Sequence, residues 1–156
     1  MAGEALVARS GHDPGRARAG PAPLIRYVSG MHRSRFSTLL IDVPRAEVPA
    51  ATEFWSSALG VPARPSPDEE QFTSLRGAFP ELVMAIQSVD DAPRYHIDIE
   101  TDDLDAETAR LIGLGAVEIG RWLDCRTLQA PGGHLLCVIP VHSAPETFQR
   151  LAQVWE

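Results

Sequence analysis

The most regular alternation of apolar and polar residues in the chain runs from residue 94 to residue 100. A period of two predicts a β-strand that is apolar on one face and polar on the other. The predicted apolar face holds Tyr95, Ile97 and Ile99, and the polar face holds His96, Asp98 and Glu100. This strand therefore presents a histidine and two carboxylates on the face away from the core.

A helix is predicted directly after this strand. Asp102 or Asp103 can cap its first turn, and acidic residues follow, where they complement the helix dipole. Leu104, Leu111 and Ile112 form an apolar stripe, and Gly115 lies where a left-handed residue commonly ends a helix. The unit is thus a strand whose apolar face packs against a helix.

The same order of elements occurs in the first half of the chain. Residues 36–42 predict a strand, and residues 47–59 predict a helix that Gly60 ends. We expect the core side of this helix to hold Ala51, Phe54, Trp55, Ala58 and Leu59. Residues 62–67 are expected to form a loop. Further strands are predicted at residues 71–76, 81–89, 117–123, 125–129 and 134–140.

These elements fall into two similar units. Leu59-Gly60 recurs as Leu114-Gly115, an offset of 114 − 59 = 55 residues. Two βαβββ repeats are therefore predicted, in an α+β fold with a cupped mixed sheet and the helices on its outer face. The uncovered face of the sheet would line a cleft.

Charge and composition set the expected partners and location. The net charge is -7, but residues 1–35 hold six arginines against Glu4 and Asp13, so the remainder is strongly acidic. An acidic body argues against a nucleic-acid partner. No apolar run reaches the roughly 20 residues that span a bilayer, and no signal peptide is evident, so a cytoplasmic protein is expected. Cys125 and Cys137 are read as free thiols.

Three segments are predicted. Residues 1–33 are rich in Gly, Ala, Pro and Arg and are expected to be a disordered basic extension. Such an extension is either a basic arm for an anionic partner or a leader without function, with Met31 as the true start, and we favour the second interpretation. Residues 34–142 form the domain. Residues 143–156 predict a C-terminal helix, with Ser143 as cap and Pro145 in its first turn.

Five short motifs resemble the vicinal oxygen chelate superfamily, which includes glyoxalases, bleomycin-resistance proteins and ring-cleaving dioxygenases. They are L-L-I-D at 39–42, F-W-S-S-A-L-G at 54–60, R-Y-H-I-D-I at 94–99, A-R-L-I-G-L-G-A at 109–116 and P-G-G-H-L-L-C-V at 131–138. They are most similar to the actinobacterial glyoxalase-like branch. The resemblance implies a small-molecule ligand and a homodimer, and it implies no single reaction.

Metal-dependent members of this superfamily place four ligands on the cleft strands, most often His or Gln, Glu, His and Glu. By the resemblance these positions fall on Thr38, Gln87, His96 and Cys137. Both carboxylates are missing, which argues against glyoxalase I and predicts a site without metal. If a metal binds, the resemblance assigns it to His96, Gln87 and Cys137, and the thiol favours zinc.

The remaining candidates have structural and functional interpretations. His96 is a cleft-wall residue, a donor to a ligand or an acid–base group. Asp98 and Glu100 are either paired carboxylates or a water-facing edge, and we favour the edge for Glu100. Cys137 is expected in the core, and no catalytic triad is indicated. Trp122 is a possible stacking wall for a flat ligand, and Trp55 is expected in the core.

The other histidines are not expected to contribute to the site. His134 is expected to be exposed, and His12, His32 and His142 lie near the ends of the chain and are discounted. The sequence therefore predicts a small-molecule-binding domain without metal, with Thr38, Gln87, His96, Trp122 and Cys137 lining the site. A metal-dependent lyase or isomerase that uses His96 is the alternative, and an interaction protein that uses the basic arm is a third hypothesis.

Overall fold

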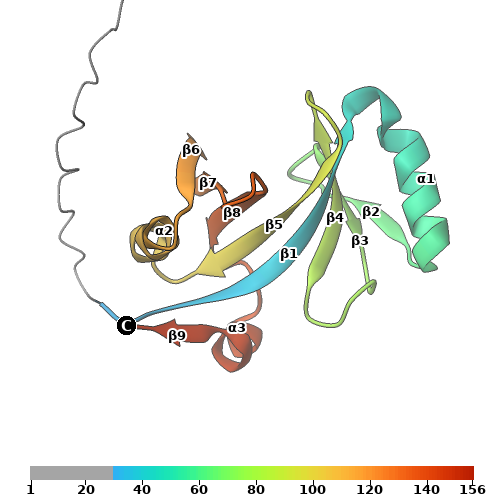
Figure 1. The fold of residues 1–156 in the computed structure, drawn as a ribbon. Helices are drawn as coiled ribbons and strands as arrows, with labels where there is room; N and C mark the ends of the chain where they lie inside the picture. Colours follow the sequence, from blue (N-terminus) through green and yellow to red (C-terminus); the bar gives the residue numbers. More distant parts are fainter. Residues whose placement is uncertain (1–29) are drawn as a thin grey trace, which may run out of the picture.

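The computed structural model describes residues 30–156 and shows one mixed sheet flanked by helices (Figure 1). The first repeat comprises β1 (His32–Pro44), a 3-10 turn η1 (Arg45–Glu47), α1 (Val48–Leu59), β2 (Ala63–Pro65), β3 (Phe72–Leu75) and β4 (Val83–Val89). The second comprises β5 (Arg94–Thr101), α2 (Leu104–Gly113), β6 (Val117–Trp122), β7 (Cys125–Gln129) and β8 (Leu135–Pro140). Helix α3 (Pro145–Leu151) and β9 (Gln153–Trp155) follow.

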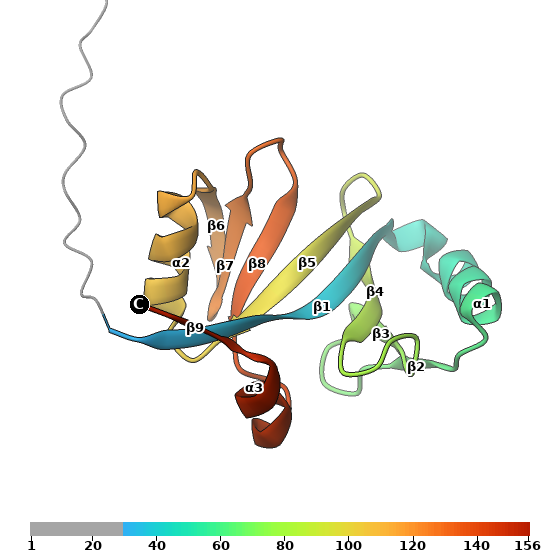
Figure 2. The same cartoon turned by 60° about the horizontal axis from the view of Figure 1, so that its bottom comes forward.

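The order of strands across the sheet confirms the two predicted repeats. The order is β2-β3-β4-β1-β5-β8-β7-β6, and β9 pairs with β1. In each repeat the first strand lies parallel to the last, β1 to β4 and β5 to β8, and β1 and β5 join the repeats as antiparallel neighbours. The long β1 and β5 cross the middle of the molecule, with α1 at one end and α2 at the other (Figures 1 and 2).

Strict alternation along the four central strands separates a core face from a concave face. On the core side, Ile41, Met84 and Ile86 form one cluster and Leu128 and Val138 belong to a second. The predicted helix positions Leu104 and Leu111 pack against the second cluster together with Ile97 and Ile99. The residues between these positions face the other side, as the period of two requires.

Both predicted glycine stops and the helix cap are confirmed. Gly60 has φ +66° and Gly115 has φ +103°, in the left-handed region that ends helices. Asp103 caps α2 by accepting a hydrogen bond from the backbone N–H of Ala106 at 2.9 Å. These signals could be predicted from the sequence because both partners of each bond lie within a few residues.

The predicted core side of α1 was only partly right. Ala51 and Trp55 pack against the first core cluster, whereas Phe54, Ala58 and Leu59 are exposed. Only one narrow side of α1 meets the sheet, so half of the broad apolar stripe remains outside. Phe54 lies edge-on to Trp55, with ring centroids 5.3 Å apart.

The segment boundaries also differ from the prediction. β1 begins at His32, four residues before the predicted strand, and Ala63–Pro65 pair as a strand within the expected loop. The C-terminal helix ends at Leu151, and Gln153–Trp155 pair with β1 instead. Ser143 does not cap this helix, although Pro145 does occupy its first turn. Residues 1–29 of the predicted extension lie outside the described part of the chain, and the predicted boundary at residue 33 was wrong because His32 and Arg33 already belong to β1.

Among residues 30–156, none of the helices has the length and apolarity needed to cross a membrane.

Candidate functional site

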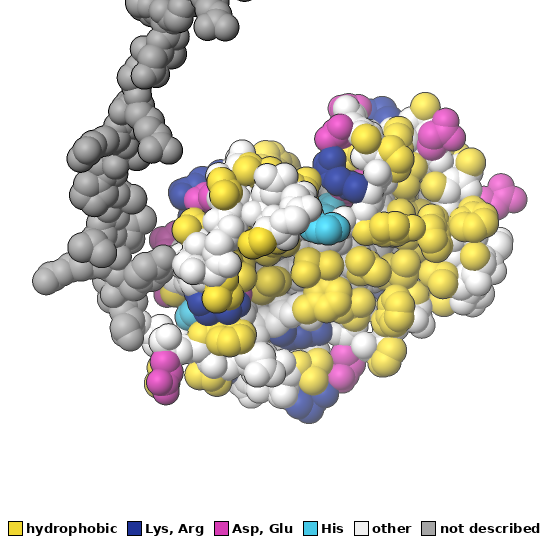
Figure 3. Space-filling view, viewed as in Figure 1, with side chains coloured by type: hydrophobic (Ala, Val, Ile, Leu, Met, Phe, Trp, Pro, Cys, Tyr) yellow, Lys and Arg dark blue, Asp and Glu magenta, His cyan; other side chains and the backbone are white. Residues whose placement is uncertain are grey.

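The concave face of the sheet encloses a cleft of about 590 Å³. Four central strands build its floor through their alternating side chains: Thr38 and Leu40 from β1, Val83, Ala85 and Gln87 from β4, His96 and Asp98 from β5, and Cys137 and Ile139 from β8. Trp122 and Phe72 belong to its walls. In the view of Figure 3, hydrophobic side chains gather over a broad part of the surface.

All five residues that the sequence predicted to line the site do line this cleft: Thr38, Gln87, His96, Trp122 and Cys137. Trp122 is 60% exposed, so its ring is free to meet a ligand. Cys137 was expected in the core and instead lies half-buried on the cleft face. The error arose because both faces of β8 are apolar, so the sequence did not indicate which one is covered.

The side chain of His96 is locked between two carboxylates. Its Nδ1 lies 3.0 Å from Oδ2 of Asp42, at the end of β1, and its Nε2 lies 3.6 Å from Oδ1 of Asp98. Burial by itself would lower the pKa of His96, but the hydrogen bond with Asp42, a contact with Cys137 and the charges of Asp42 and Asp98 together raise it to about 10. The imidazole is therefore a cation at neutral pH.

The carboxylate of Asp98 is buried and incompletely bonded. The residue is 8% exposed, and its Oδ1 has no hydrogen-bond partner. The 3.6 Å to His96 is too long for a hydrogen bond. Burial raises the pKa of Asp98 to about 6, and the neighbouring charge of Asp42 adds to this, while His96 opposes it. This group costs stability unless another molecule satisfies it.

The two thiols share the cleft floor. Cys137 lies opposite Thr127 in the β7–β8 pair, so Cys125, two residues before Thr127, faces the same side. A hydrogen bond from the Cys137 thiol lowers the pKa of Cys125, and the same bond, with burial, raises the pKa of Cys137. An activated Cys137 nucleophile, which the sequence did not favour, is not supported by this environment.

Glu100 does not face water, and the prediction of a water-facing edge was wrong. The residue is fully buried, and its carboxylate accepts hydrogen bonds from Arg35 Nη1 at 2.8 Å and from Ser143 Oγ at 2.6 Å. The backbone N–H groups of His142 and Ser143 donate to its Oε2, each at 2.9 Å. Burial raises the pKa of Glu100, but the hydrogen bonds from Ser143 and the two backbone N–H groups, with the charge of His142, outweigh it and lower the pKa.

His32 and His142, which were not expected to contribute to the site, are both held by residues far away in the sequence. His142 lines the cleft, with Nδ1 3.2 Å from Glu100 Oε2 and Nε2 3.5 Å from Thr38 Oγ1. His32 is buried and bonds Glu107 of α2 at 2.8 Å. No local pattern marks either residue, because their partners come from β5, β1 and α2. His134 is exposed, as predicted.

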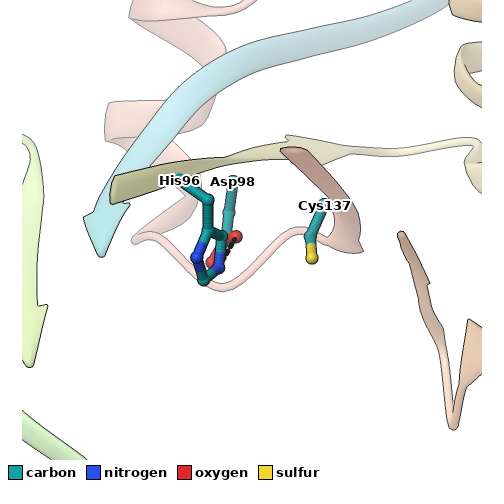
Figure 4. Close-up of side chains that lie close together, drawn as sticks. All are labelled: His96, Asp98 and Cys137. Carbon is teal, nitrogen blue, oxygen red and sulfur yellow. Dashed lines mark ion pairs between the residues drawn. The ribbon is translucent and has the colours of Figure 1, made fainter. Parts of the chain in front are cut away.

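The donors in the cleft do not fit the hard divalent ion of the superfamily. Thr38 turns its hydroxyl toward His142, Gln87 is a neutral amide, and His96 holds protons on the nitrogens that a metal would need. One group of three candidate donors occurs among the described residues, with atoms within 4.8 Å of one another: His96, Asp98 and Cys137 (Figure 4). A thiol in this set disfavours magnesium and manganese.

Comparison with protein families identifies the domain. The model of the glyoxalase-like domain matches residues 38–139, which is more than half of the chain. The chain belongs to this family. The glyoxalase-like domain lies within the vicinal oxygen chelate superfamily, so the resemblance seen in the sequence is confirmed. None of the curated proteins is similar enough to count as a relative.

Solved structures with a similar arrangement are only distantly related. A methylmalonyl-CoA epimerase from Mycobacterium tuberculosis shares 17% identity over 71% of this chain and 89% of its own, with a TM-score of 0.44. The Streptomyces coelicolor methylmalonyl-CoA epimerase in complex with 2-nitronate-propionyl-CoA shares 15% identity over 71% and 98%, with a TM-score of 0.43. Identities and scores this low carry no functional argument.

Proposed function

We propose that this glyoxalase-like domain binds a small, partly aromatic molecule that is neutral or positively charged, without the divalent metal of the superfamily. The observation that carries the proposal is the unbonded Oδ1 of the buried Asp98 on the floor of the cleft. Buried polar groups nearly always have a hydrogen-bond partner, either in the protein or in ordered water. A group that lacks one and has a perturbed pKa is typical of a binding site.

The walls of the cleft support an aromatic ligand. Phe72, Trp122 and Leu123 surround a floor on which Leu40 and Ile139 are apolar. Small-molecule sites commonly combine such apolar walls with a few polar groups that orient the ligand. An aromatic ring stacked on Trp122 gains about 0.5–1.5 kcal/mol beyond the area that it buries.

The charges of the cleft oppose an anionic ligand. Its acidic residues are Glu69, Asp98 and Asp124, and none of the described lining residues is an arginine or a lysine. The cation on His96 lies between Asp42 and Asp98 and is already compensated. The coenzyme A thioesters named with the two epimerases carry phosphates, which bind best to arginine or lysine. We therefore do not propose a coenzyme A substrate.

The test is a series of three phenyl compounds of similar size, measured by tryptophan fluorescence with and without EDTA. We expect affinity to fall from 2-phenylethylamine to 2-phenylethanol to 3-phenylpropanoate, with no effect of EDTA. Asp98→Asn should reduce the preference for the amine, whereas Asp105→Asn, on the outer helix α2, should leave it unchanged. Equal or tighter binding of the anion, or loss of binding in EDTA, would contradict the proposal.

A second candidate is a metal-dependent lyase or isomerase that uses His96 with Gln87 or Cys137. The observation that favours it is the proximity of an imidazole, a carboxylate and a thiol, a set compatible with zinc. Elemental analysis of untagged protein grown with zinc, nickel, manganese and iron decides between the two. Near-stoichiometric metal that disappears in His96→Ala would favour the enzyme over the metal-free cleft.

Three wider expectations remain proposals. The homodimer and a drug-sequestering role like that of bleomycin-resistance proteins rest on the resemblance alone, and the cytoplasmic location rests on composition. The basic arm lies outside the described residues. Size-exclusion chromatography with light scattering tests the dimer without reference to any ligand.

A further inference from the structure

We infer that His142 and Thr38 form a second polar subsite of the cleft, that Glu100 positions it, and that the ligand carries two hydrogen-bond donors. One donor meets Asp98 and the other meets His142. This inference rests on the proposed function and narrows the ligand to a diol, an amino alcohol or a similar compound. His142 lies beyond residues 38–139, so the family match does not include it.

Glu100 anchors the segment that follows β8. Glu100 is fully buried and binds the backbone N–H groups of both His142 and Ser143, in addition to the Ser143 hydroxyl. Arg35, from β1, holds the same carboxylate from the other side. These bonds fix the backbone at residue 142 relative to β5. The imidazole of His142 therefore has a defined place at the cleft.

The contacts of the His142 ring indicate which of its two nitrogens carries the hydrogen. Nδ1 lies 3.2 Å from Oε2 of Glu100, an ionic contact, and the negative charge of the carboxylate favours a hydrogen rather than a lone pair on the nitrogen that faces it. In the neutral ring the hydrogen is therefore on Nδ1, and Nε2 is an acceptor. Nε2 lies 3.5 Å from the Thr38 hydroxyl, at the outer limit of a hydrogen bond. This acceptor is therefore only weakly engaged within the protein.

His96 and His142 differ in the groups that their ring nitrogens face. Both nitrogens of His96 face carboxylates, Asp42 on one side and Asp98 on the other, so both carry hydrogens. His142 faces one carboxylate and one hydroxyl. Of these two cleft histidines, only His142 is an acceptor for a ligand.

The two acceptors, Asp98 and His142, lie near each other in the cleft. Thr38 lies directly opposite Asp98 in the β1–β5 pair, and opposite residues have Cβ atoms about 4.5–5.5 Å apart. The Thr38 hydroxyl in turn approaches His142. Asp98 and His142 thus flank Thr38 on one floor. A ligand with two neighbouring donors satisfies both acceptors at once.

The test compares two probes that differ by one hydroxyl, 1-phenyl-1,2-ethanediol (each enantiomer separately) and 2-phenylethanol. One additional hydrogen bond is worth about 1 kcal/mol, so we expect one enantiomer of the diol to bind wild-type protein about five- to tenfold more tightly than the alcohol. His142→Ala should abolish this preference. His134→Ala, which removes an exposed histidine outside the cleft, should retain it.

A second measurement needs no ligand. The ¹⁵N shifts of the neutral His142 ring should report the Nδ1–H tautomer, and Ser143→Ala, which removes one of the bonds that position Glu100, should shift the balance toward Nε2–H. A ring that is merely packed at the surface would not respond to this change.

The outcomes separate the two proposals. If alcohol and diol bind wild-type protein equally, the subsite is overturned and the proposed function stands. If neither probe binds, the proposed function fails with these probes, and the tautomer still decides the subsite. An Nε2–H tautomer in wild-type protein would overturn the placement of His142 by itself.

Discussion

Two carboxylates on the polar face of β5 lie two residues apart and have opposite surroundings. Glu100 is fully buried and accepts hydrogen bonds from Arg35, Ser143 and two backbone N–H groups. Asp98 is almost as buried, but its Oδ1 has no hydrogen-bond partner, and its charged neighbour His96 lies 3.6 Å away. The comparison shows that burial alone does not indicate what a charge does. The hydrogen-bond partners decide whether a buried carboxylate stabilises the fold or is available to bind a ligand.

The pKa values of the two groups reflect the same difference. Burial favours the neutral form of both. At Glu100 the hydrogen bonds outweigh burial and lower the pKa, whereas at Asp98 burial prevails and raises the pKa to about 6. Glu100 thus stabilises the folded protein as an anion, and Asp98 destabilises it as an anion.

The largest effect is expected from Glu100→Gln. The change removes the charged partner of the buried Arg35, whose other hydrogen bond goes to the Glu81 carbonyl, and places an amide NH₂ among backbone donors. Breaking a buried ion pair in this way costs about 3–5 kcal/mol. Urea unfolding at pH 7.5 measures the loss of unfolding free energy. A loss below about 1 kcal/mol would show that Glu100 does not anchor the segment after β8.

The next effect concerns the cation beside Asp98. The folded pKa of His96 is raised to about 10, so its stabilising contribution is complete below about pH 6.5 and is lost as the pH rises toward 10. His96→Gln should therefore destabilise the protein by several kcal/mol at pH 6, and by progressively less up to pH 10. A destabilisation that is constant over this range would contradict the proposed ion pairs with Asp42 and Asp98.

Asp98→Asn should have the opposite sign to Glu100→Gln. Because the folded pKa of Asp98 is above its unfolded value, stability falls as the pH rises from about 3.8 to about 6, and the penalty stays in full above that. The neutral amide should therefore stabilise the protein by about 1–3 kcal/mol at pH 8 and have almost no effect at pH 3.5. Thermal unfolding at both pH values, with Asp105→Asn as control, measures the difference.

The smallest effect on stability is expected at Trp122, which lines the cleft. Because its side chain is 60% exposed, Trp122→Ala should change the unfolding free energy by no more than about 0.5 kcal/mol. Loss of stacking should nevertheless weaken 2-phenylethylamine binding up to about tenfold. Leu114→Ala, which truncates an exposed residue outside the cleft, should change neither quantity, and calorimetry provides both tests.

Much of the candidate site was predicted through the resemblance to the superfamily, which assigned Thr38, Gln87, His96 and Cys137 to the cleft. Strand alternation gives the physical reason that they share a face, since each occupies the matching parity of its strand. The repeat of strand and helix also predicted two similar units in one cupped sheet. The partly wrong prediction for the core side of α1 shows the limit of such patterns. When apolar residues cover half the surface of a helix, the pattern does not indicate which of them pack against the sheet.

What the sequence by itself determined is the pair of βαβββ repeats, the glycine stops of the helices and the residues that share a face. Only the tertiary structure decided that the polar face of β5 is enclosed, and that Glu100 is bonded while Asp98 is not. The reason is distance along the chain: the partners of Glu100 lie 65 residues before it and 43 residues after it. Local periodicity carries no information about bonds between residues so far apart.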